Sequence, residues 1–535
     1  MVTSNSTSSP SSVRVWLPTR QLVRGNDCAT RIVWCRDAWV RQGRVSGRRR
    51  QVAGNKQNIG GLEAKRRRKT WIVVASVLVL VLGIAAGVVA TLKPWTEEFR
   101  HGGLTIADPP SPVRPLPQVA PAPPTAPAPS VTGLAAALAP VIGNPDLGIF
   151  AASVSDADSG KVLWTTDPDK PMIPASTAKV LTTAAALLAL PPDHRVSTQV
   201  VTGAAANELV LVGGGDPTLT AQPDGKGYYP NGPKLSDLVA QVKSSGQKPD
   251  TIVVDTSAYT GSSMAQGWDP ADIGGGSIAP IDSVMIDGGR LNPLVEYSPR
   301  TATPALDAGR RLATELGLDP AKVRLGTAPA AATKVASVQS APLRDRLRDM
   351  MVHSDDVLAE TIGREIAVAA GSEASFTGTV TAMATTLRAA GFDATGLTLL
   401  DASGLSVDDL IPPRLLDRIV TVAALPNSAV GQETSSVAST SNAVADPLAA
   451  LLDYLPVAGA TGSLTDRYTS RDRVGAGWVR AKTGTLDVAS ALVGYVLDRD
   501  GRVLTFALMS NQRLPEQSRA ALDAIAAALR NCGCS

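Results

Sequence analysis

A serine and a lysine three residues apart form the first pair that could do chemistry. Ser176 and Lys179 stand in the run Pro-Ala-Ser-Thr-Ala-Lys, and this spacing places both side chains on one face of a helix. A nearby amine can accept the serine proton if burial or other cations lower its pKa. The helix start would add free N–H groups beside the serine. Alone, the pattern also fits a capping serine with a surface lysine.

A second run could hold a carboxylate. Lys482, Thr483, Gly484 and Thr485 follow one another just before the C-terminal strands that the sequence predicts. A lysine and a threonine at a strand edge can bind a substrate carboxylate. Gly484 carries no side chain, so a ligand backbone could approach closely. By itself this run also fits a simple turn.

A third candidate is Ser354, in the run His-Ser-Asp-Asp that ends at Asp356. It lies between two segments that read as helices, 343–351 and 356–370. A hydroxyl at this place could relay a proton between a leaving nitrogen and the lysines.

The elements that must position these residues lie at both ends of one region. Apolar runs bounded by turn residues predict strands before the first motif and after the last one, with a hairpin turn at Asp500-Gly501. Segments rich in Ala and Leu predict a helix that opens at the first motif and a closing helix near the C-terminus. We therefore expect an α/β sandwich whose sheet uses both ends of the folded part. The predicted strands are 147–155, 161–166, 489–497 and 503–510, and the helices are 180–190 and 518–529.

The order S-x-x-K, S-D-x, K-T-G is far more specific than any one motif, and it resembles the penicillin-binding and serine β-lactamase superfamily. Three further boxes narrow the resemblance. A glycine-rich box lies at 211–219, a D-x-S-G-L-S box at 401–406 and a G-S-L-x-x-R box at 462–467. Together they are similar to the D-alanyl-D-alanine carboxypeptidase/endopeptidase group, peptidase family S13, the class C low-molecular-mass penicillin-binding proteins. The resemblance covers about 147–529.

The resemblance implies a mixed α/β (α+β) fold, a transpeptidase-like catalytic domain with an inserted accessory domain. Between Lys179 and Ser354 lie 174 residues, too many for a loop. We assign 133–200 and 336–535 to the catalytic domain and 201–335 to the insertion.

The resemblance also implies a mechanism for trimming peptidoglycan stem peptides. Ser176 attacks the carbonyl of the penultimate D-Ala, Lys179 is the general base and Ser354 shuttles the proton to the leaving D-Ala. Lys482 and Thr483 hold the terminal carboxylate, and the N–H groups of Ser176 and Thr485 form the oxyanion hole. β-Lactams would act as inhibitors, and no metal or organic cofactor is required.

One position departs from the family pattern, S-x-N, because Asp356 replaces the asparagine. An ionised carboxylate donates no hydrogen bond and would pair with a lysine, raising the pKa of that lysine and weakening it as a base. Two alternatives to a working carboxypeptidase therefore stay open. One is a penicillin-binding envelope module with weak turnover. The other is a serine β-lactamase, which has no need of a long tether or a large insertion.

The N-terminal part predicts a membrane anchor. Residues 1–70 hold 16 Lys and Arg against three acids, and Trp71–Leu92 follows without a charge. At about 1.5 Å per residue this run can cross a bilayer core of about 30 Å. A cleaved signal peptide and a buried core helix are the alternatives. The cationic residues before the run favour a cytoplasmic N-terminus and an extracytoplasmic catalytic domain in a single-pass membrane protein.

The flanking segments lack the pattern of a folded domain. We expect 1–70 to be a disordered cytoplasmic tail. The segment 93–132 should be a Pro/Ala-rich linker, since ten prolines fall within 107–130 and proline cannot continue a helix or a central strand.

Composition excludes several functions. Aromatic residues make up 4% of the chain, which disfavours nucleic-acid binding by base stacking. Three widely spaced histidines exclude most histidine-based metal sites. Cys28 and Cys35 would stay thiols in the cytoplasm, whereas Cys532 and Cys534 could form a tight bridge outside.

Overall fold

A computed structural model describes residues 62–92, 126–425 and 443–535, which divide between two compact units, Met1–Arg114 and Pro115–Ser535. In the first unit the described part is one helix, α1 (Leu62–Leu92). Its stretch Ala75–Leu92 has a mean hydropathy of 2.5. The helix is long and apolar enough to cross a membrane.

Helix α1 begins earlier than the apolar run, so residues 62–70, which we assigned to a disordered tail, are helical. The reason is that Leu, Glu, Ala, Lys and Arg are all strong helix formers and the apolar run continues the same helix. The predictions for 1–61, for 93–125 of the linker, and for Cys28 and Cys35 lie outside the described residues.

The second unit is built around an antiparallel sheet with strand order β2-β1-β10-β9-β8. Strand β1 comes from the N-terminal end of this unit and pairs with β10, with Ile149 opposite Asn511. This pairing confirms the prediction that one sheet uses both ends of the folded part. The strands are β1 (Ile149–Asp156), β2 (Val162–Thr166), β8 (Arg480–Leu486), β9 (Ala489–Leu497) and β10 (Val503–Asn511).

Helices cover both faces of this sheet, as their apolar sides require. Helix α14 (Pro515–Asn531) and helix α3 (Val131–Ile142) pack together on one face, and α11 (Pro413–Ala424) packs on the other. Beyond α11 lies a helical layer that carries the first and third motifs. Its members are α4 (Lys179–Ala189), α8 (Leu343–His353), α9 (Asp356–Ala369), α10 (Phe376–Ala389) and α13 (Ala450–Tyr454).

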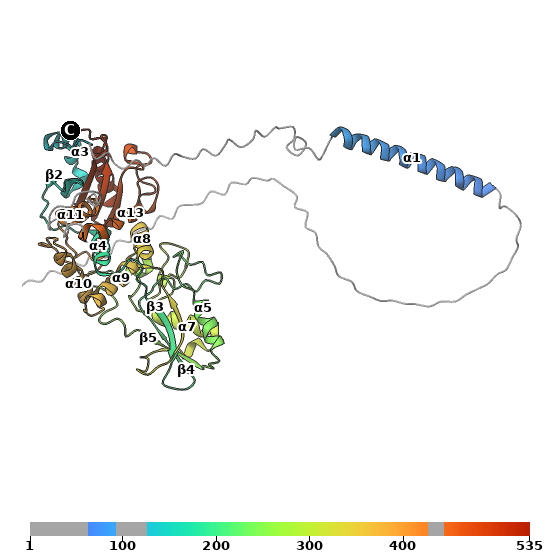
Figure 1. Cartoon of the computed structure of the whole chain (residues 1–535), viewed down its shortest axis with the longest axis horizontal. Helices are drawn as coiled ribbons and strands as arrows, with labels where there is room; N and C mark the ends of the chain where they lie inside the picture. The colour runs from blue at the N-terminus through green and yellow to red at the C-terminus, as the bar shows by residue number, and fades with distance from the viewer. Residues whose placement is uncertain (1–61, 93–125, 426–442) are drawn as a thin grey trace, which may run out of the picture. The chain divides into compact units, whose positions relative to one another are not determined.

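A second sheet lies in the long segment between the first and third motifs, where Figure 1 labels β3, β4 and β5. Its strand order is β6-β5-β4-β3-β7. Its β4–β5 and β5–β6 pairs are parallel, and helices α5 and α7 contact each other over its separate apolar core. The division of the second unit into domains stays a prediction. The strands are β3 (Ser197–Thr202), β4 (Glu208–Val212), β5 (Thr251–Asp255), β6 (Arg324–Leu325) and β7 (Lys334–Gln339), and the helices are α5 (Leu235–Ser244), α6 (Ala271–Gly275) and α7 (Pro304–Leu316).

Short 3₁₀ turns connect many of these elements. They are η1 (Pro145–Leu147), η2 (Ala175–Ala178), η3 (Asp287–Gly289), η4 (Pro320–Lys322), η5 (Gly462–Leu464) and η6 (Arg473–Gly475).

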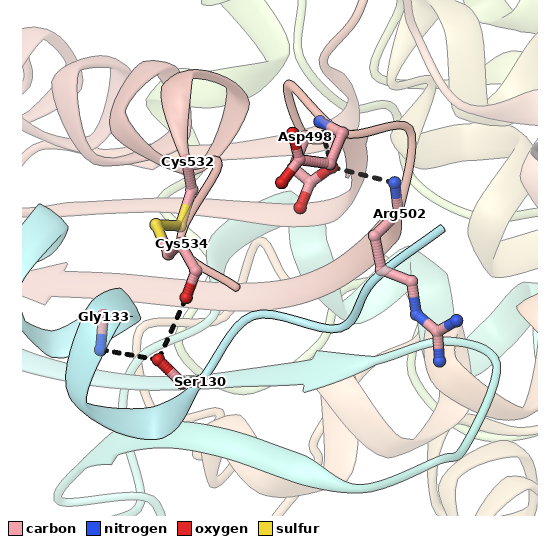
Figure 2. The surroundings of a disulfide bond; sticks show 7 residues. Ser130, Gly133, Asp498, Arg502, Cys532 and Cys534 are labelled. Atoms are coloured by element: carbon pink, nitrogen blue, oxygen red, sulfur yellow. Dashed lines mark hydrogen bonds between the residues drawn. A yellow bond between two sulfur atoms is a disulfide. The ribbon is translucent and has the colours of Figure 1, made fainter. Parts of the chain in front are cut away.

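The C-terminus is bonded to the start of the second unit (Figure 2). Cys532 and Cys534 form a disulfide after the end of α14, the bridge that the sequence allows. The Cys534 carbonyl oxygen accepts hydrogen bonds from the Ser130 N–H at 2.9 Å and from Ser130 Oγ at 3.0 Å. Ser130 Oγ in turn accepts from the Gly133 N–H and caps α3. This C-terminal clasp, residues 130–133 with 532–534, holds α3 against α14.

Candidate active site

The first motif lies in the 3₁₀ turn η2, directly before α4. We expected Ser176 in the first turn of an α-helix, and the tighter turn follows from the residue before it. Ala175 has a φ of 47°, a left-handed conformation that costs a residue with a side chain about 1–2 kcal/mol. Gly404 allows this bend, because a Cβ at position 404 would lie 2.0 Å from the Ala175 carbonyl oxygen.

Lys179 is the amine that contacts the candidate nucleophile. Its Nζ lies 3.0 Å from Ser176 Oγ, 2.5 Å from Asp356 Oδ1 and 2.8 Å from the Ser403 carbonyl oxygen. Lys179 is fully buried. Burial raises the pKa of Asp356, and the Lys179 ammonium lowers it by less, so the pKa of this carboxyl lies above its usual value. These three contacts use all three hydrogens of an ammonium group, so the lysine must lose a proton before it can act as a base.

The D-x-S-G-L-S box fixes the carbonyl that Lys179 contacts. Buried Asp401 accepts hydrogen bonds from the N–H groups of Ser403, Gly404 and Ser406 at 2.6–3.0 Å. It also accepts one from Trp268 Nε1 at 2.7 Å. Without the family resemblance, the sequence would predict only a turn here.

The third motif places Ser354 beside the second lysine. Ser354 ends α8 with a φ of 57°, and α9 begins two residues later. Lys482 Nζ lies 2.8 Å from Ser354 Oγ and 2.9 Å from the Thr483 carbonyl oxygen. Burial, together with the positive charge of Lys179, lowers the pKa of Lys482 well below its usual value. The two lysines are therefore close enough to act on each other.

Asp355 holds the turn between Ser354 and α9. Its Oδ1 accepts from the Leu358 N–H at 2.9 Å and caps α9. Its Oδ2 accepts from Arg290 Nη2 at 2.9 Å and from the Tyr229 hydroxyl at 2.7 Å. Burial alone would raise the pKa of Asp355, but the neighbouring guanidinium groups and these hydrogen bonds keep it below its usual value. The segment that carries the second sheet thus supports the third motif, a link that the sequence did not predict.

Strand β8 presents the remaining predicted residues. Thr483 and Thr485 lie on one face of the strand, because side chains alternate along it. Thr483 Oγ1 is hydrogen-bonded to Ser463 Oγ at 2.6 Å, so the G-S-L-x-x-R box orients this hydroxyl. At Gly484 the close neighbour is the protein's own backbone, since a Cβ would lie 2.4 Å from the Pro174 carbonyl oxygen. The absent side chain lets β8 lie against the turn that carries Ser176.

All the predicted site residues are therefore gathered from three distant parts of the chain. Ser176, Lys179 and Asp356 form one connected group, and Ser354, Lys482 and Thr483 form a second. Four further site residues were not predicted, although three of them lie in boxes that the resemblance had marked. They are Asp401, Ser403, Ser463 and Asp355. Within 62–92, 126–425 and 443–535 no group of three or more His, Cys, Asp or Glu side chains could hold a metal ion.

The sheet is built from both ends of the second unit, and Ser176, hydrogen-bonded to Lys179, lies beside its edge strand β8. This arrangement matches the class of fold that the resemblance predicts, that of penicillin-binding proteins and serine β-lactamases. The comparisons with known proteins give the family. The model of the D-Ala-D-Ala carboxypeptidase 3 (S13) family matches residues 134–299 and 294–532. The chain belongs to this family.

Two curated carboxypeptidases are similar over nearly their whole length. Carboxypeptidase DacB of Mycolicibacterium smegmatis is 46% identical over 88% of this chain and 98% of the relative. A carboxypeptidase of Mycobacterium tuberculosis is 45% identical over 88% of this chain and 99% of the relative. Among solved structures, penicillin-binding protein 4 of Haemophilus influenzae matches with a TM-score of 0.58, at 21% identity, over 75% of this chain and 98% of that protein. This likeness confirms the predicted fold.

Proposed function

We propose that the chain is a serine D-Ala-D-Ala carboxypeptidase that trims peptidoglycan stem peptides through an acyl-enzyme on Ser176. One observation carries the proposal. Lys179 Nζ lies 3.0 Å from Ser176 Oγ while Lys482 Nζ lies 2.8 Å from Ser354 Oγ, so each hydroxyl has its own amine. Family membership and the curated carboxypeptidases support the same reaction.

In the first half-reaction, neutral Lys179 takes the Ser176 proton as Oγ attacks the carbonyl carbon of the penultimate D-Ala. The N–H groups of Ser176 and Thr485 stabilise the oxyanion, where one donor is typically worth about 10²–10³ in rate. Ser354 then passes its proton to the leaving amine and regains one from Lys482, to which its Oγ is bonded, while the C–N bond breaks and D-Ala departs. Water next attacks the ester carbonyl and gives up a proton to Lys482 through Ser354. Lys179 returns its proton to Ser176 Oγ as the ester bond breaks and the shortened peptide is released.

Binding of the terminal carboxylate is assigned to Lys482 and Thr483. Lys482 is fully buried, and its Nζ donates a hydrogen bond to Ser354 Oγ. A proton can therefore move between these two groups. Thr483 Oγ1 is held by Ser463. A substrate carboxylate that arrives here would favour the protonated form of Lys482, because an opposite charge within contact favours the charged form.

We also propose that α1 anchors the enzyme in the cytoplasmic membrane, with the N-terminus inside and the catalytic unit outside. The apolar stretch Ala75–Leu92 and the five cationic residues 65–69 before it support this orientation. Membership of a family that acts on the cell wall supports an extracytoplasmic catalytic unit.

The test is to find which atom becomes acylated. The full chain in detergent is incubated with labelled penicillin, digested and mapped by mass spectrometry, and D-Ala release from a stem pentapeptide is measured in parallel. We expect the adduct on Ser176 and stoichiometric release of D-Ala. An adduct elsewhere would contradict the proposal. Rapid hydrolysis of the adduct without D-Ala release would instead indicate a β-lactamase.

A second candidate, a penicillin-binding module with weak turnover, is favoured by the contact of Asp356 with Lys179. The carboxylate accepts a hydrogen bond from Lys179 Nζ at 2.5 Å, and an uncharged amide oxygen would hold that hydrogen less strongly. We therefore expect Asp356→Asn to raise acylation by penicillin at neutral pH by about tenfold, the size of a modest change in charge pairing. Acylation rates over a range of pH provide the measurement, with Asp193→Asn, an exposed aspartate, as the control. A collapse of acylation in Asp356→Asn alone would show that the carboxylate is required.

A further inference from the structure

An exposed guanidinium lies beside the strand to which carboxylate binding is assigned. Arg519, in the first turns of α14, donates from Nε to Thr485 Oγ1 at 3.2 Å. Thr485 lies on the same face of β8 as Thr483, two residues away. Among the described residues no carboxylate oxygen lies within 4.0 Å of its guanidinium, although Glu516 and Asp523 are near enough to act on its charge. It is therefore a cation without a direct ion pair at the edge of the site.

The start of α14 is fixed to the same hairpin. Ser518 Oγ donates to Ser490 Oγ at 2.8 Å, and both side chains are fully buried. Ser490 is the residue on β9 that pairs with Thr485 on β8. Two neighbouring residues of α14 thus contact two paired residues of one hairpin, which sets the place of the Arg519 side chain relative to Thr485.

The G-S-L-x-x-R box fixes the backbone of Arg519 from the other side. Arg467 Nη2 donates to the Arg519 carbonyl oxygen at 3.3 Å. Arg467 is itself held by two hydrogen bonds to Asp523, one turn further along α14. The same box therefore orients Thr483 through Ser463 and supports Arg519 through Arg467. Ser463 and Arg467 thus act on the same edge of β8.

We propose that Arg519 is a substrate-binding residue that contacts the C-terminal carboxylate of the peptide together with Thr483. This inference rests on the proposed carboxypeptidase function and deepens it. The buried Lys482 readily loses its charge, whereas a guanidinium stays protonated at any working pH and can bind a carboxylate with two parallel hydrogen bonds. Arg519 is then the permanent positive charge at this edge and selects a free carboxylate over a neutral amide.

The experiment compares two peptides that differ only in this charge. Using the full chain in detergent, kcat and KM are measured for diacetyl-Lys-D-Ala-D-Ala and for its C-terminal amide. For the free acid we expect Arg519→Ala to lower kcat/KM by about tenfold or more, mostly through KM, as the loss of a charge-assisted hydrogen bond predicts. Cleavage of the amide should change by no more than about twofold, and Arg519→Lys should keep part of the preference.

Arg388→Ala is the matched control, an exposed arginine on α10 that should leave both peptides unaffected. Equal losses of kcat/KM on the acid and the amide would overturn the inference and leave Arg519 with only a structural role. Unchanged cleavage of both peptides by Arg519→Ala would also overturn it. A wild-type chain that cleaves neither peptide and takes no penicillin label would contradict the carboxypeptidase function itself, a result distinct from either of these.

Discussion

Lys179→Ala is expected to lower acylation of Ser176 by about 10³-fold or more, within the range that a general base contributes. Lys179 is the one amine among the described residues with a hydrogen bond to Ser176 Oγ, and full burial keeps water from replacing it. The measurement is the second-order rate of labelling by penicillin, followed with time on gels. Lys179→Arg should be as slow, because a guanidinium keeps the positive charge but does not act as a base.

Removing Lys179 leaves Asp356 buried without its cation, which would destabilise the fold. The double variant Lys179→Ala/Asp356→Asn removes both charges and should fold while staying unreactive. Lys161→Ala, on an exposed lysine, is the control for loss of an amine. Fast labelling of the folded double variant would mean that another group takes the Ser176 proton.

Lys482→Ala is expected to give the second-largest loss, about 10²-fold or more in kcat/KM for the peptide. The variant loses both the ammonium that receives the carboxylate and the partner of Ser354 Oγ at 2.8 Å. Because the pKa of Lys482 is lowered, the wild-type rate should fall as pH rises through that lowered pKa, well before an ordinary lysine would titrate. The residual activity of Lys482→Ala should not show this fall in rate at alkaline pH.

The same shift has a defined sign for folding stability. A lysine whose pKa is lower in the native state binds fewer protons there than in the unfolded chain. The free energy of unfolding should therefore rise with pH between the lowered pKa and the usual value near 10.5. Urea unfolding of the wild type and of Lys482→Ala at several pH values measures the difference. If the two show the same pH dependence of stability, Lys482 does not titrate at a shifted pKa.

Local patterns were enough to predict most elements of the catalytic sheet. The predicted strand 489–497 coincides with β9, and 503–510 ends one residue before β10 does. Val503 pairs with Leu497, so residues 498–502, which include the predicted turn Asp500-Gly501, close this hairpin. The second sheet was not resolved into strands from sequence. Its parallel pairs, β4 with β5 and β5 with β6, join residues about 40 and about 70 positions apart in the sequence, and no local pattern reports such pairings.

Contacts within the site could be predicted from the sequence only where the residues involved lie in one continuous motif. The contact of Lys179 with Ser176 follows from a spacing of three residues, and the pairing of Asp356 with one of the two lysines was foreseen from charge alone. The structure pairs Asp356 with Lys179 because α9 packs against α4. The sequence spacing of these residues does not predict that packing. Arg519 was predicted only as one position of an Ala-rich helix, since its place beside Thr485 follows from the docking of α14 on the β8–β9 hairpin.

The C-terminal clasp has a mechanical consequence. If the enzyme is tethered through the residues before Ala126, a pull along the tether first meets the hydrogen bond from Arg502 Nη1 to the Ala126 carbonyl oxygen at 3.1 Å. Arg502 is itself paired with Asp156 at the end of β1. The two hydrogen bonds from Ser130 to the Cys534 carbonyl oxygen then share the load with the disulfide loop and the end of α14. None of these contacts involves the turn that carries Ser176, and the part of α14 that bears Arg519 is held on the hairpin by Ser518.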